Sequence, residues 1–413
     1  MTRRIKKSAA WIVPGYNSGV SRRVYIDWAR GIAVLVMIWA HTMDAWTRAA
    51  DRHGLAYRDA AVLGGFAAPL FLWLAGLALV LAATRAAERP DPAAAPARRS
   101  SGRGRGVEVA CRRGLEIFIL AFLFRLQGFI VTPGGPPVTL FRVDVLNIMG
   151  PAMVGVGLLW GAGGTVVARV VSCAVAAAAI GMLTPVVRAS SLVGALPISL
   201  QWYMRPAGDL TIFTLFPWAG FVFAGAAVGA LLAATRNERA ERRLHLILAA
   251  FGAVLIAFGF YMAGRPSIYR VSSFWTSSPT WFAIRVGILM VAVSVIYGVF
   301  AVLRSQFDVN VAQPFRAASA VAGRPEGPRF ERRPPIDPLA RFGRSSLFIY
   351  WIHVELVYGY ATWPIRARLP LWGVVVAYAA FCAVMYGAIV LRDRLVDGWR
   401  IRRVRQTAQN ATV

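Results

Sequence analysis

The sequence predicts an all-α protein, a polytopic membrane bundle of about ten transmembrane helices with both termini on the cytoplasmic side. Composition is the first observation behind this prediction, because 57% of the 413 residues are hydrophobic and only 16% are charged. Soluble domains average about 45–50% apolar and about 25% charged residues. The second observation is a series of apolar stretches of about 20 residues, the length that one helix needs to cross the bilayer core. The third is that basic residues gather in alternate connecting segments.

Each predicted span is an apolar stretch bounded by polar or basic residues. The ten spans cover residues 27–47, 61–84, 113–132, 142–163, 165–187, 211–234, 243–263, 281–303, 342–361 and 370–391. Residues 191–204 are partly apolar but too short to cross the bilayer, so we expect them to lie at the membrane interface.

The charge of the chain supports this topology. There are 46 Lys and Arg against 19 Asp and Glu, a net charge of +27, and most basic residues fall inside when the N-terminus is placed inside. Their expected role is to anchor the helices beside the anionic lipid bilayer, and no nucleic-acid partner is predicted because no recognition module accompanies them. We predict basic cytoplasmic ends at 1–26 and 392–413, a membrane domain over 27–391, and flexible cytoplasmic loops at 85–112 and 304–341.

Motifs of soluble enzymes and metal sites are not found in the sequence. The three cysteines form no disulfide framework or Cys-pair motif, and the histidines lack the spacing of metal ligands, so no metal is predicted. No P-loop, dinucleotide fingerprint or H-E-x-x-H pattern occurs, and no cleaved signal peptide is expected at the N-terminus.

The first predicted span carries the clearest pattern of ionisable residues, Arg30, His41 and Asp44. Such groups are costly in hydrocarbon and are therefore candidates for function. Eleven helical steps place Arg30 and His41 on one face, about 16 Å apart along the axis. Asp44 lies three residues after His41, where a carboxylate can orient an imidazole and raise its basicity. The alternatives are that Arg30 extends its charge to the inner interface and that His41 makes a structural hydrogen bond.

Other polar residues fall at a similar depth in the outer half of the predicted bundle. They are Arg125, Gln127, Arg142, Asp144, Asn147, Arg285, His353 and Glu355. Together they predict one polar cavity, in which the arginines would mainly pair with carboxylates, Asp44 included. His53, in the first outer loop, is an exposed alternative base, and His245 is expected to be structural.

Five segments carry short motifs in a fixed order. Residues 21–33 resemble "R-x-x-x-I-D-x-x-R-G-I-A", 66–76 "P-x-F-x-F-x-x-G", 144–150 "V-L-x-x-x-G", 216–225 "F-P-W-x-G-x-x-x-x-G" and 342–353 "G-R-x-S-L-x-I-Y-x-x-H". These are similar, in the same order, to the motifs of the heparan-α-glucosaminide N-acetyltransferase-like family of membrane acyltransferases. The ten residues between an arginine and a histidine in the first span are also similar to the first-helix signature of the related acyltransferase-3 family.

The resemblance implies that an acyl group, most simply acetyl, passes from cytoplasmic acetyl-CoA or another acyl-CoA to a sugar amine or hydroxyl beyond the membrane. The acceptor would be a glycan or glycolipid, and the location a bacterial inner membrane. The sequence is also compatible with a homo-oligomer. The alternative functions are a proton-coupled transporter or glycan exporter that uses the same cavity, and a membrane scaffold without chemistry.

The resemblance also suggests roles for individual residues. Arg30 and Arg344 would bind CoA phosphates, as would Arg112 and Arg113. The key histidine of the family lies just beyond the first helix, where His53 is offset by one residue. The general base is therefore either His41, oriented by Asp44, or His53. Arg125, Asp144, Asn147, Arg285 and His353 would contact the substrate, and Asn147 or Arg285 would stabilise the oxyanion.

Overall fold

The computed structural model describes residues 23–89, 102–131, 136–211, 213–321 and 337–410, and this part of the chain is almost entirely helical. Its only β pairing consists of two isolated bridges, Thr47 with Leu369 and Val143 with Thr211. The all-α prediction is confirmed. The longer helices are α1 (Val24–Trp46), α2 (Leu55–Gly64), α3 (Ala67–Glu88), α4 (Gly102–Val131), α5 (Val145–Ala162), α6 (Val166–Ala189), α9 (Leu215–Ala234), α10 (Glu238–Ala263), α11 (Pro279–Val321), α13 (Ser346–Tyr358) and α14 (Leu371–Asn410).

Short helical turns connect these elements. They are η1 (Ala49–Asp51), η3 (Pro137–Phe141), α7 (Ser191–Gly194), α8 (Ile198–Met204), η4 (Gly208–Leu210), α12 (Pro338–Arg344) and η5 (Tyr360–Ile365). α7 and α8 occupy the stretch at 191–204 that the sequence analysis judged too short to span.

Nine helical segments of the described chain are long and apolar enough to cross a membrane, so this is an integral membrane protein. They correspond to nine of the ten predicted spans. The prediction at 342–361 is wrong in form, because the chain there is broken at Ser345 into α12 and α13. α13 has 13 residues, about 20 Å of helix, which is less than the thickness of the hydrocarbon core.

The structure also changes the limits of the two predicted loops. α4 begins at Gly102, so residues 102–112 are helical, and α11 runs on to Val321. The rest of these loops, residues 90–101 and 322–336, lies outside the described part of the chain. Exposed apolar side chains follow the outer faces of α4 and α6, among them Leu115, Ile119 and Val171. Such faces are expected where helices meet lipid.

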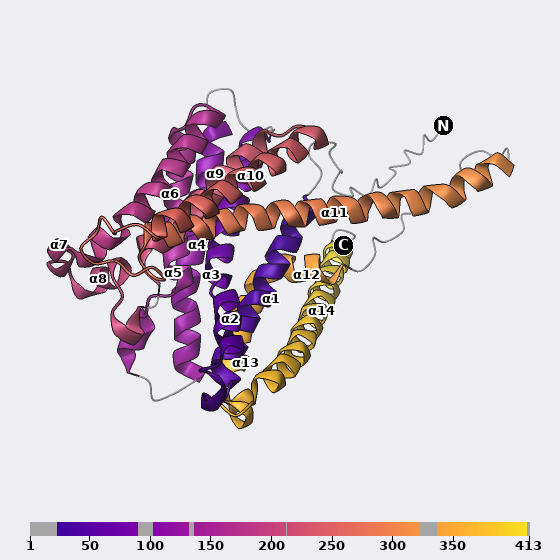
Figure 1. Cartoon of the computed structure of the whole chain (residues 1–413). Helices are drawn as coiled ribbons and strands as arrows, with labels where there is room; N and C mark the ends of the chain where they lie inside the picture. Colours follow the sequence, from indigo (N-terminus) through magenta and orange to yellow (C-terminus); the bar gives the residue numbers. More distant parts are fainter. Residues whose placement is uncertain (1–22, 90–101, 132–135, 212, 322–336, 411–413) are drawn as a thin grey trace.

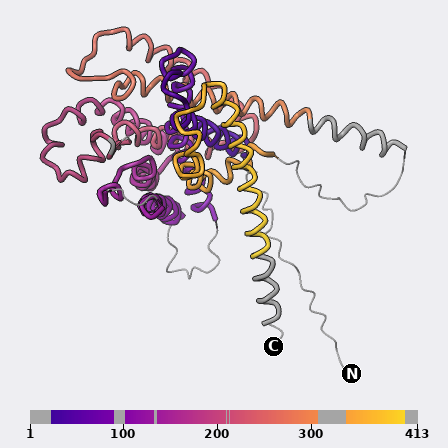
Figure 2. The backbone as a smooth tube through the Cα atoms, turned by 90° about the horizontal axis from the view of Figure 1, so that it is seen from below, coloured from indigo at the N-terminus to yellow at the C-terminus, as the bar shows by residue number. Residues whose placement is uncertain are grey.

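α1 is the central element of the half of the bundle that carries the candidate site. It contacts α2, α3, α12, α13 and α14, and in Figure 2 the indigo α1 and the orange-to-yellow α12–α14 segment occupy the same part of the view. α3 packs on α4 and α9, α9 on α6, and α10 on α11. Figure 1 shows α1, α2, α13 and α14 gathered at one side, with α6, α9 and α10 at the other.

Glycines allow the two closest helix crossings near the site. At the crossing of α1 and α12, a Cβ added to Gly343 would lie 1.9 Å from the Asp27 carbonyl oxygen, and one at Gly31 would lie 2.2 Å from the Leu339 carbonyl oxygen. These glycines therefore permit backbone contact between helices that are more than 300 residues apart in sequence.

The second crossing joins α3 and α9 in the same way. A Cβ at Gly76 would lie 1.9 Å from the Val222 carbonyl oxygen, and one at Gly225 would lie 1.8 Å from that of Trp73. All four glycines occur in motif segments identified in the sequence, so these parts of the motifs serve helix packing.

Candidate functional site

A cavity of about 860 Å³ opens among α1, α3, α4, α5 and the start of α13, and we call it the arginine cavity. Phe71, Met149, Met153 and Leu347 form part of its apolar wall. Its charged lining consists of Arg23, Asp27, Arg30, Arg85, Arg112, Arg113 and Glu116. An apolar cleft with several arginines suits an elongated ligand that has a lipophilic arm and an anionic head.

Two of the charged side chains that line the arginine cavity are held at its wall by neighbours. The Arg30 guanidinium donates a hydrogen bond to the Ser346 hydroxyl at 3.2 Å, which joins α1 to the first turn of α13. Glu116 accepts hydrogen bonds from Arg112 at 3.1 Å and Arg113 at 3.2 Å, all within α4. The net charge of the lining remains positive.

Of the four arginines predicted to bind CoA phosphates, one lies apart from the other three. Arg30, Arg112 and Arg113 line the arginine cavity, but Arg344 does not and is exposed at the end of α12. That the three lining arginines bind CoA phosphates stays a prediction. The break at Ser345 separates Arg344, the last residue of α12, from Ser346 and Leu347, the first residues of α13 and the ones that line the cavity.

At the other end of α1, Tyr358 joins His41 to Asp44. The Tyr358 hydroxyl lies 3.1 Å from His41 Nδ1 and donates to Asp44 Oδ2 at 2.7 Å. A carboxylate only accepts, so the Tyr358 proton is used on Asp44 and its oxygen accepts from His41 Nδ1–H. His41 Nε2 is then the nitrogen with a free lone pair, the form that a general base requires. Asp44 is near His41, as predicted, but it acts on the imidazole through Tyr358.

His353 lies beside His41 and is fully buried. The two ring centres are 5.1 Å apart. His353 Nδ1 donates to the Ile349 carbonyl oxygen at 2.8 Å, and its Nε2 has no hydrogen-bond partner within the described residues. The helix thus fixes the tautomer of His353 and leaves a buried acceptor beside His41.

A row of aromatic rings leads from the arginine cavity to this histidine pair. Phe71 lines the cavity, and its ring centre lies 6.0 Å from that of Tyr350. Tyr350 lies 6.0 Å from His353, which in turn contacts His41. The cavity and the histidines are therefore neighbours along α1 and α13, with side chains rather than open space between them.

The predicted polar residues on α4 and α5 form a structural unit. Arg125 makes an ion pair with Asp144 that is largely screened from solvent, as expected for an arginine in a span. The Asp144 backbone N–H donates to Asn147 Oδ1 at 3.0 Å in a capping box at the start of α5. The capping box uses the amide oxygen of Asn147, and the role of its amide N–H₂ as an oxyanion donor stays a prediction.

Arg285 does not make the expected ion pair with Asp44, Asp144 or Glu355. Its guanidinium carbon lies 4.9 Å from the ring centre of Trp281 and 5.9 Å from that of Trp218, a cation–π arrangement. The aromatic environment on α9 and α11 replaces the carboxylate partner that was inferred from depth alone. Its Nε lacks a hydrogen-bond partner in the part of the chain described.

The two remaining histidines have different environments. His53 is exposed in the turn between η1 and α2. His245 is buried, stacks on Tyr297 with ring centres 4.1 Å apart, and its Nε2 lies 3.2 Å from the Tyr25 hydroxyl. Tyr25 donates to Glu241 at 2.6 Å, so His245 belongs to a structural network, as predicted.

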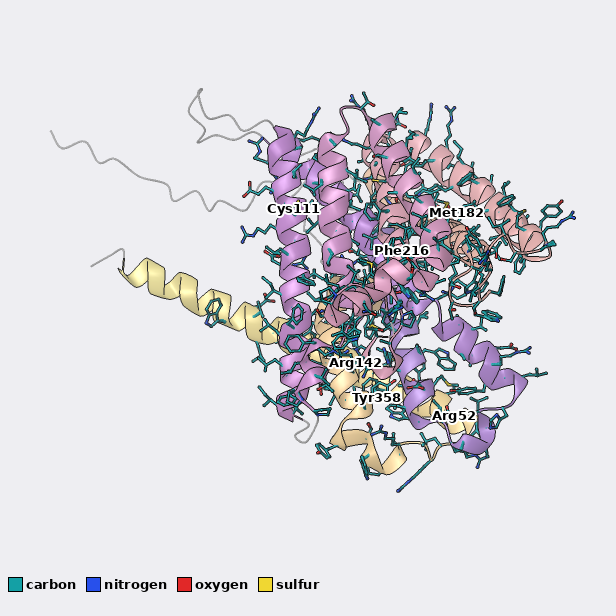
Figure 3. The ribbon with its side chains drawn as sticks, turned by 90° about the vertical axis from the view of Figure 1, so that its left-hand side faces the viewer. Arg52, Cys111, Arg142, Met182, Phe216 and Tyr358 are labelled. Carbon is teal, nitrogen blue, oxygen red and sulfur yellow. The ribbon has the colours of Figure 1, made fainter. Side chains whose placement is uncertain are left out.

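Figure 3 shows how the two ends of the site are separated. Tyr358, Arg52 and Arg142 lie toward one end of the molecule, whereas Cys111, beside Arg112 and Arg113, lies toward the other. Three residues at the site, Tyr358, Ser346 and Arg85, were not predicted from the sequence. Ser346 falls within a motif segment and could have been chosen, but Tyr358 carries no signal because its partners are more than 300 residues away.

Comparison with known families identifies the membrane domain. Residues 22–268 match the sequence profile described as heparan-alpha-glucosaminide N-acetyltransferase, catalytic, and no curated protein gave a significant match. The matched segment contains Arg30, His41 and most of the arginine cavity, whereas α12 and α13 lie beyond it. Because the match covers more than half of the chain, this protein belongs to the heparan-alpha-glucosaminide N-acetyltransferase family, whose acetyltransferases use acetyl-CoA.

Proposed function

We propose that this protein transfers an acetyl group from cytoplasmic acetyl-CoA to an amino sugar on the outer side of a bacterial inner membrane. The observation that carries the proposal is the arrangement along α1, where Arg30 lines the arginine cavity and His41 lies 11 residues further on, at the opposite end of the site. Eleven residues of helix span about 16 Å, a distance suited to an extended thiol arm between an anionic head and its thioester.

Arginines would hold the donor. Arg30, Arg85 and the Arg112–Arg113 pair present planar guanidinium groups, which bind phosphate oxygens in bidentate fashion. The apolar residues Met149, Met153 and Leu347 suit the less polar arm. The acetyl end must then pass Phe71 and Tyr350 to reach His41, so these rings shift when the donor binds.

His41 is the proposed general base. Its Nε2 would accept a proton from the acceptor amine as the nitrogen attacks the thioester carbonyl; the carbon–sulfur bond breaks and the CoA thiolate leaves. Tyr358 and Asp44 would hold the imidazole in the required tautomer and stabilise its positive charge. We favour His41 over His53 because His53 is exposed, and no carboxylate or hydroxyl is found to orient it among the described contacts.

Acetyl transfer in membrane vesicles tests the choice of base. Radiolabelled acetyl-CoA is supplied on the cytoplasmic side and a glucosamine-terminated acceptor on the other, and His41→Ala is compared with His53→Ala at equal membrane content. We expect His41→Ala to lose 10²-fold or more of the rate, the usual contribution of a general base, and His53→Ala to stay near wild type. The reverse result would make His53 the base. Acceptor movement without any acetyl-CoA would instead indicate a transporter.

Arg30→Ala tests the donor site in the same assay. Removing a charge-assisted hydrogen bond costs about 1.5–3 kcal/mol, so the KM for acetyl-CoA should rise at least tenfold, with a smaller change in kcat. Arg344→Ala is the matched control, because Arg344 is exposed and does not line the cavity. An unchanged KM in Arg30→Ala would remove Arg30 from the donor site.

A further inference from the structure

A second cavity, of about 400 Å³, adjoins the arginine cavity at the C-terminal end of α3. Arg23, Leu81 and Arg85 line both cavities. The lining of the second cavity continues one turn further along α3, through Thr84 and Glu88. It therefore extends the arginine cavity away from His41, toward the connections between helices.

Basic residues dominate the second cavity. Arg169 and Arg236 join Arg23 and Arg85 there, against the single carboxylate of Glu88. The N-terminus of the 24-residue helix α6 also reaches it through Val166. The Thr165 side chain already caps the Ala168 N–H there, but the partial positive charge of the helix N-terminus still favours an anion, in addition to the arginines.

Arg169 is held in a fixed position. Its Nε donates to the carbonyl oxygens of Trp160 at 3.2 Å and Gly163 at 3.0 Å, and its guanidinium lies 4.1 Å from the centre of the Trp160 ring. Both of its hydrogen bonds within the described chain use Nε. The two terminal nitrogens are thus available as a rigid pair of donors, the geometry that binds a phosphate with little loss of entropy.

We propose that the second cavity binds the 3′-phosphate of the CoA nucleotide, with Arg169 and Arg236 as its specific donors. This inference rests on the proposed use of acetyl-CoA. CoA carries a diphosphate next to its pantetheine arm and a separate phosphate monoester on the ribose, close to two negative charges at neutral pH. A donor whose thioester points toward His41 has its ribose phosphate at the far end, where the second cavity lies. Arg23 and Arg85, shared by both cavities, would lie between the two phosphate groups.

The test compares CoA with 3′-dephospho-CoA, which differ only in this phosphate. Binding of each to the purified protein is measured by calorimetry, so the result does not depend on acetyl transfer. We expect wild type to bind CoA about tenfold or more tightly. Arg236→Gln should reduce that ratio toward one by weakening CoA binding alone, since Arg236 is exposed and makes no hydrogen bond within the described chain. Arg243→Gln, on the exposed face of α10 outside both cavities, should keep the wild-type ratio.

Arg169→Gln provides a second variant and should act in the same direction as Arg236→Gln. A wild-type ratio near one, or a ratio unchanged in both variants, would overturn the proposal while leaving acetyl transfer intact. The proposal would also be overturned if the protein bound both nucleotides equally and phosphatidylglycerol stabilised wild type but not Arg236→Gln. The cavity would then be assigned to a lipid headgroup. Acetyl transfer is measured with acetyl-CoA and with acetyl-3′-dephospho-CoA as donors. If both donors react, only the phosphate site is wrong; if neither reacts, the proposed function itself has failed.

Discussion

Tyr358 determines the chemical state of His41 at the scale of single residues. Its hydroxyl is the only group found between the imidazole and Asp44 among the described contacts, and the direction of its proton decides which ring nitrogen is free. An orienting group of this kind does not touch the substrate, so it is a positioning residue. Its loss should affect the rate of transfer more than the binding of the donor.

Tyr358→Phe tests this role, because it keeps the ring and removes only the hydroxyl. The expected loss is about 1–2 kcal/mol of transition-state stabilisation, a fall in kcat of about five- to thirtyfold with the KM for acetyl-CoA unchanged. Steady-state acetyl transfer in vesicles measures both constants. Tyr360→Phe is the matched control, because Tyr360 is exposed two residues further on. A proportional rise in KM would instead indicate that Tyr358 supports the donor cavity.

The residues that sequence could place are those whose relation is local. Arg30, His41 and Asp44 share one helix, so its periodicity alone predicts their common face. Contacts that depend on the tertiary fold could not be predicted in this way. The 317-residue separation between His41 and Tyr358 is one case, and the aromatic environment of Arg285 is another. Depth in the membrane predicted a carboxylate partner for both Arg125 and Arg285 without saying which one. Arg125 pairs with Asp144, whereas Arg285 lies against tryptophans, because several side chains share each depth.

Close helix crossings decide how the elements hold the site together. Gly31 and Gly343 bring α1 against α12, and this contact also sets where α13 begins and so where Ser346 meets Arg30. The same packing explains why span length failed as a predictor at 342–361. A segment protected by neighbouring helices can break within the membrane domain, because its free backbone groups find partners there. Hydropathy alone does not report such a break.

Gly343→Ala tests the crossing of α1 and α12. The new methyl group would meet the Asp27 carbonyl oxygen at 1.9 Å, so the helices must separate. Overpacking of this kind costs about 1–3 kcal/mol, and we expect a lower melting temperature and weaker CoA binding. Gly387→Ala is the control, since nothing lies within 4 Å of its added carbon and alanine favours a helix. Equal melting temperatures for the two variants would contradict the close contact.

Asp51 links the loop after α1 to the start of α14. Its carboxylate accepts from the Leu371 backbone N–H at 2.9 Å and from Arg48 at 3.0 Å. Both bonds lower the pKa of Asp51, and the bond from the Leu371 N–H has the larger effect. Because the pKa of Asp51 is lower in the folded protein, the stabilisation from this link is fully present above the pKa of the unfolded chain, about 4. It is lost as the pH falls through the pKa of the folded protein.

The expected consequence is acid-sensitive protection of the first turn of α14. Hydrogen exchange should show the protection factor of the Leu371 amide falling at acidic pH in wild type and already low at pH 7 in Asp51→Ala. Asp59→Ala serves as the control, because its carboxylate is exposed and only loosely paired with Arg58. Protection that is independent of both pH and Asp51 would show that other contacts hold this helix end.

The orientation of the whole molecule connects its charge to its proposed chemistry. The proposed reaction requires the arginine cavity to face the cytoplasm, where acyl-CoA is found, and His53 to face the opposite side. The distribution of basic residues predicts this orientation. The arginines of the two cavities belong to the same excess of positive charge. Composition alone therefore predicted the environment of the protein, but it could not separate arginines that anchor the topology from those that line a cavity.

Cysteine labelling tests that orientation. Single cysteines are introduced in a background without Cys111, Cys173 and Cys382, at the exposed residues His53 and Arg239. His53→Cys should react with a membrane-impermeant maleimide in intact spheroplasts, whereas Arg239→Cys, in the first turn of α10, should react only after the membrane is opened. Both variants should retain acetyl transfer, since neither residue lines a cavity or belongs to the proposed catalytic group. The opposite labelling would place the arginine cavity on the side without acyl-CoA, and the proposed direction of transfer would then be wrong.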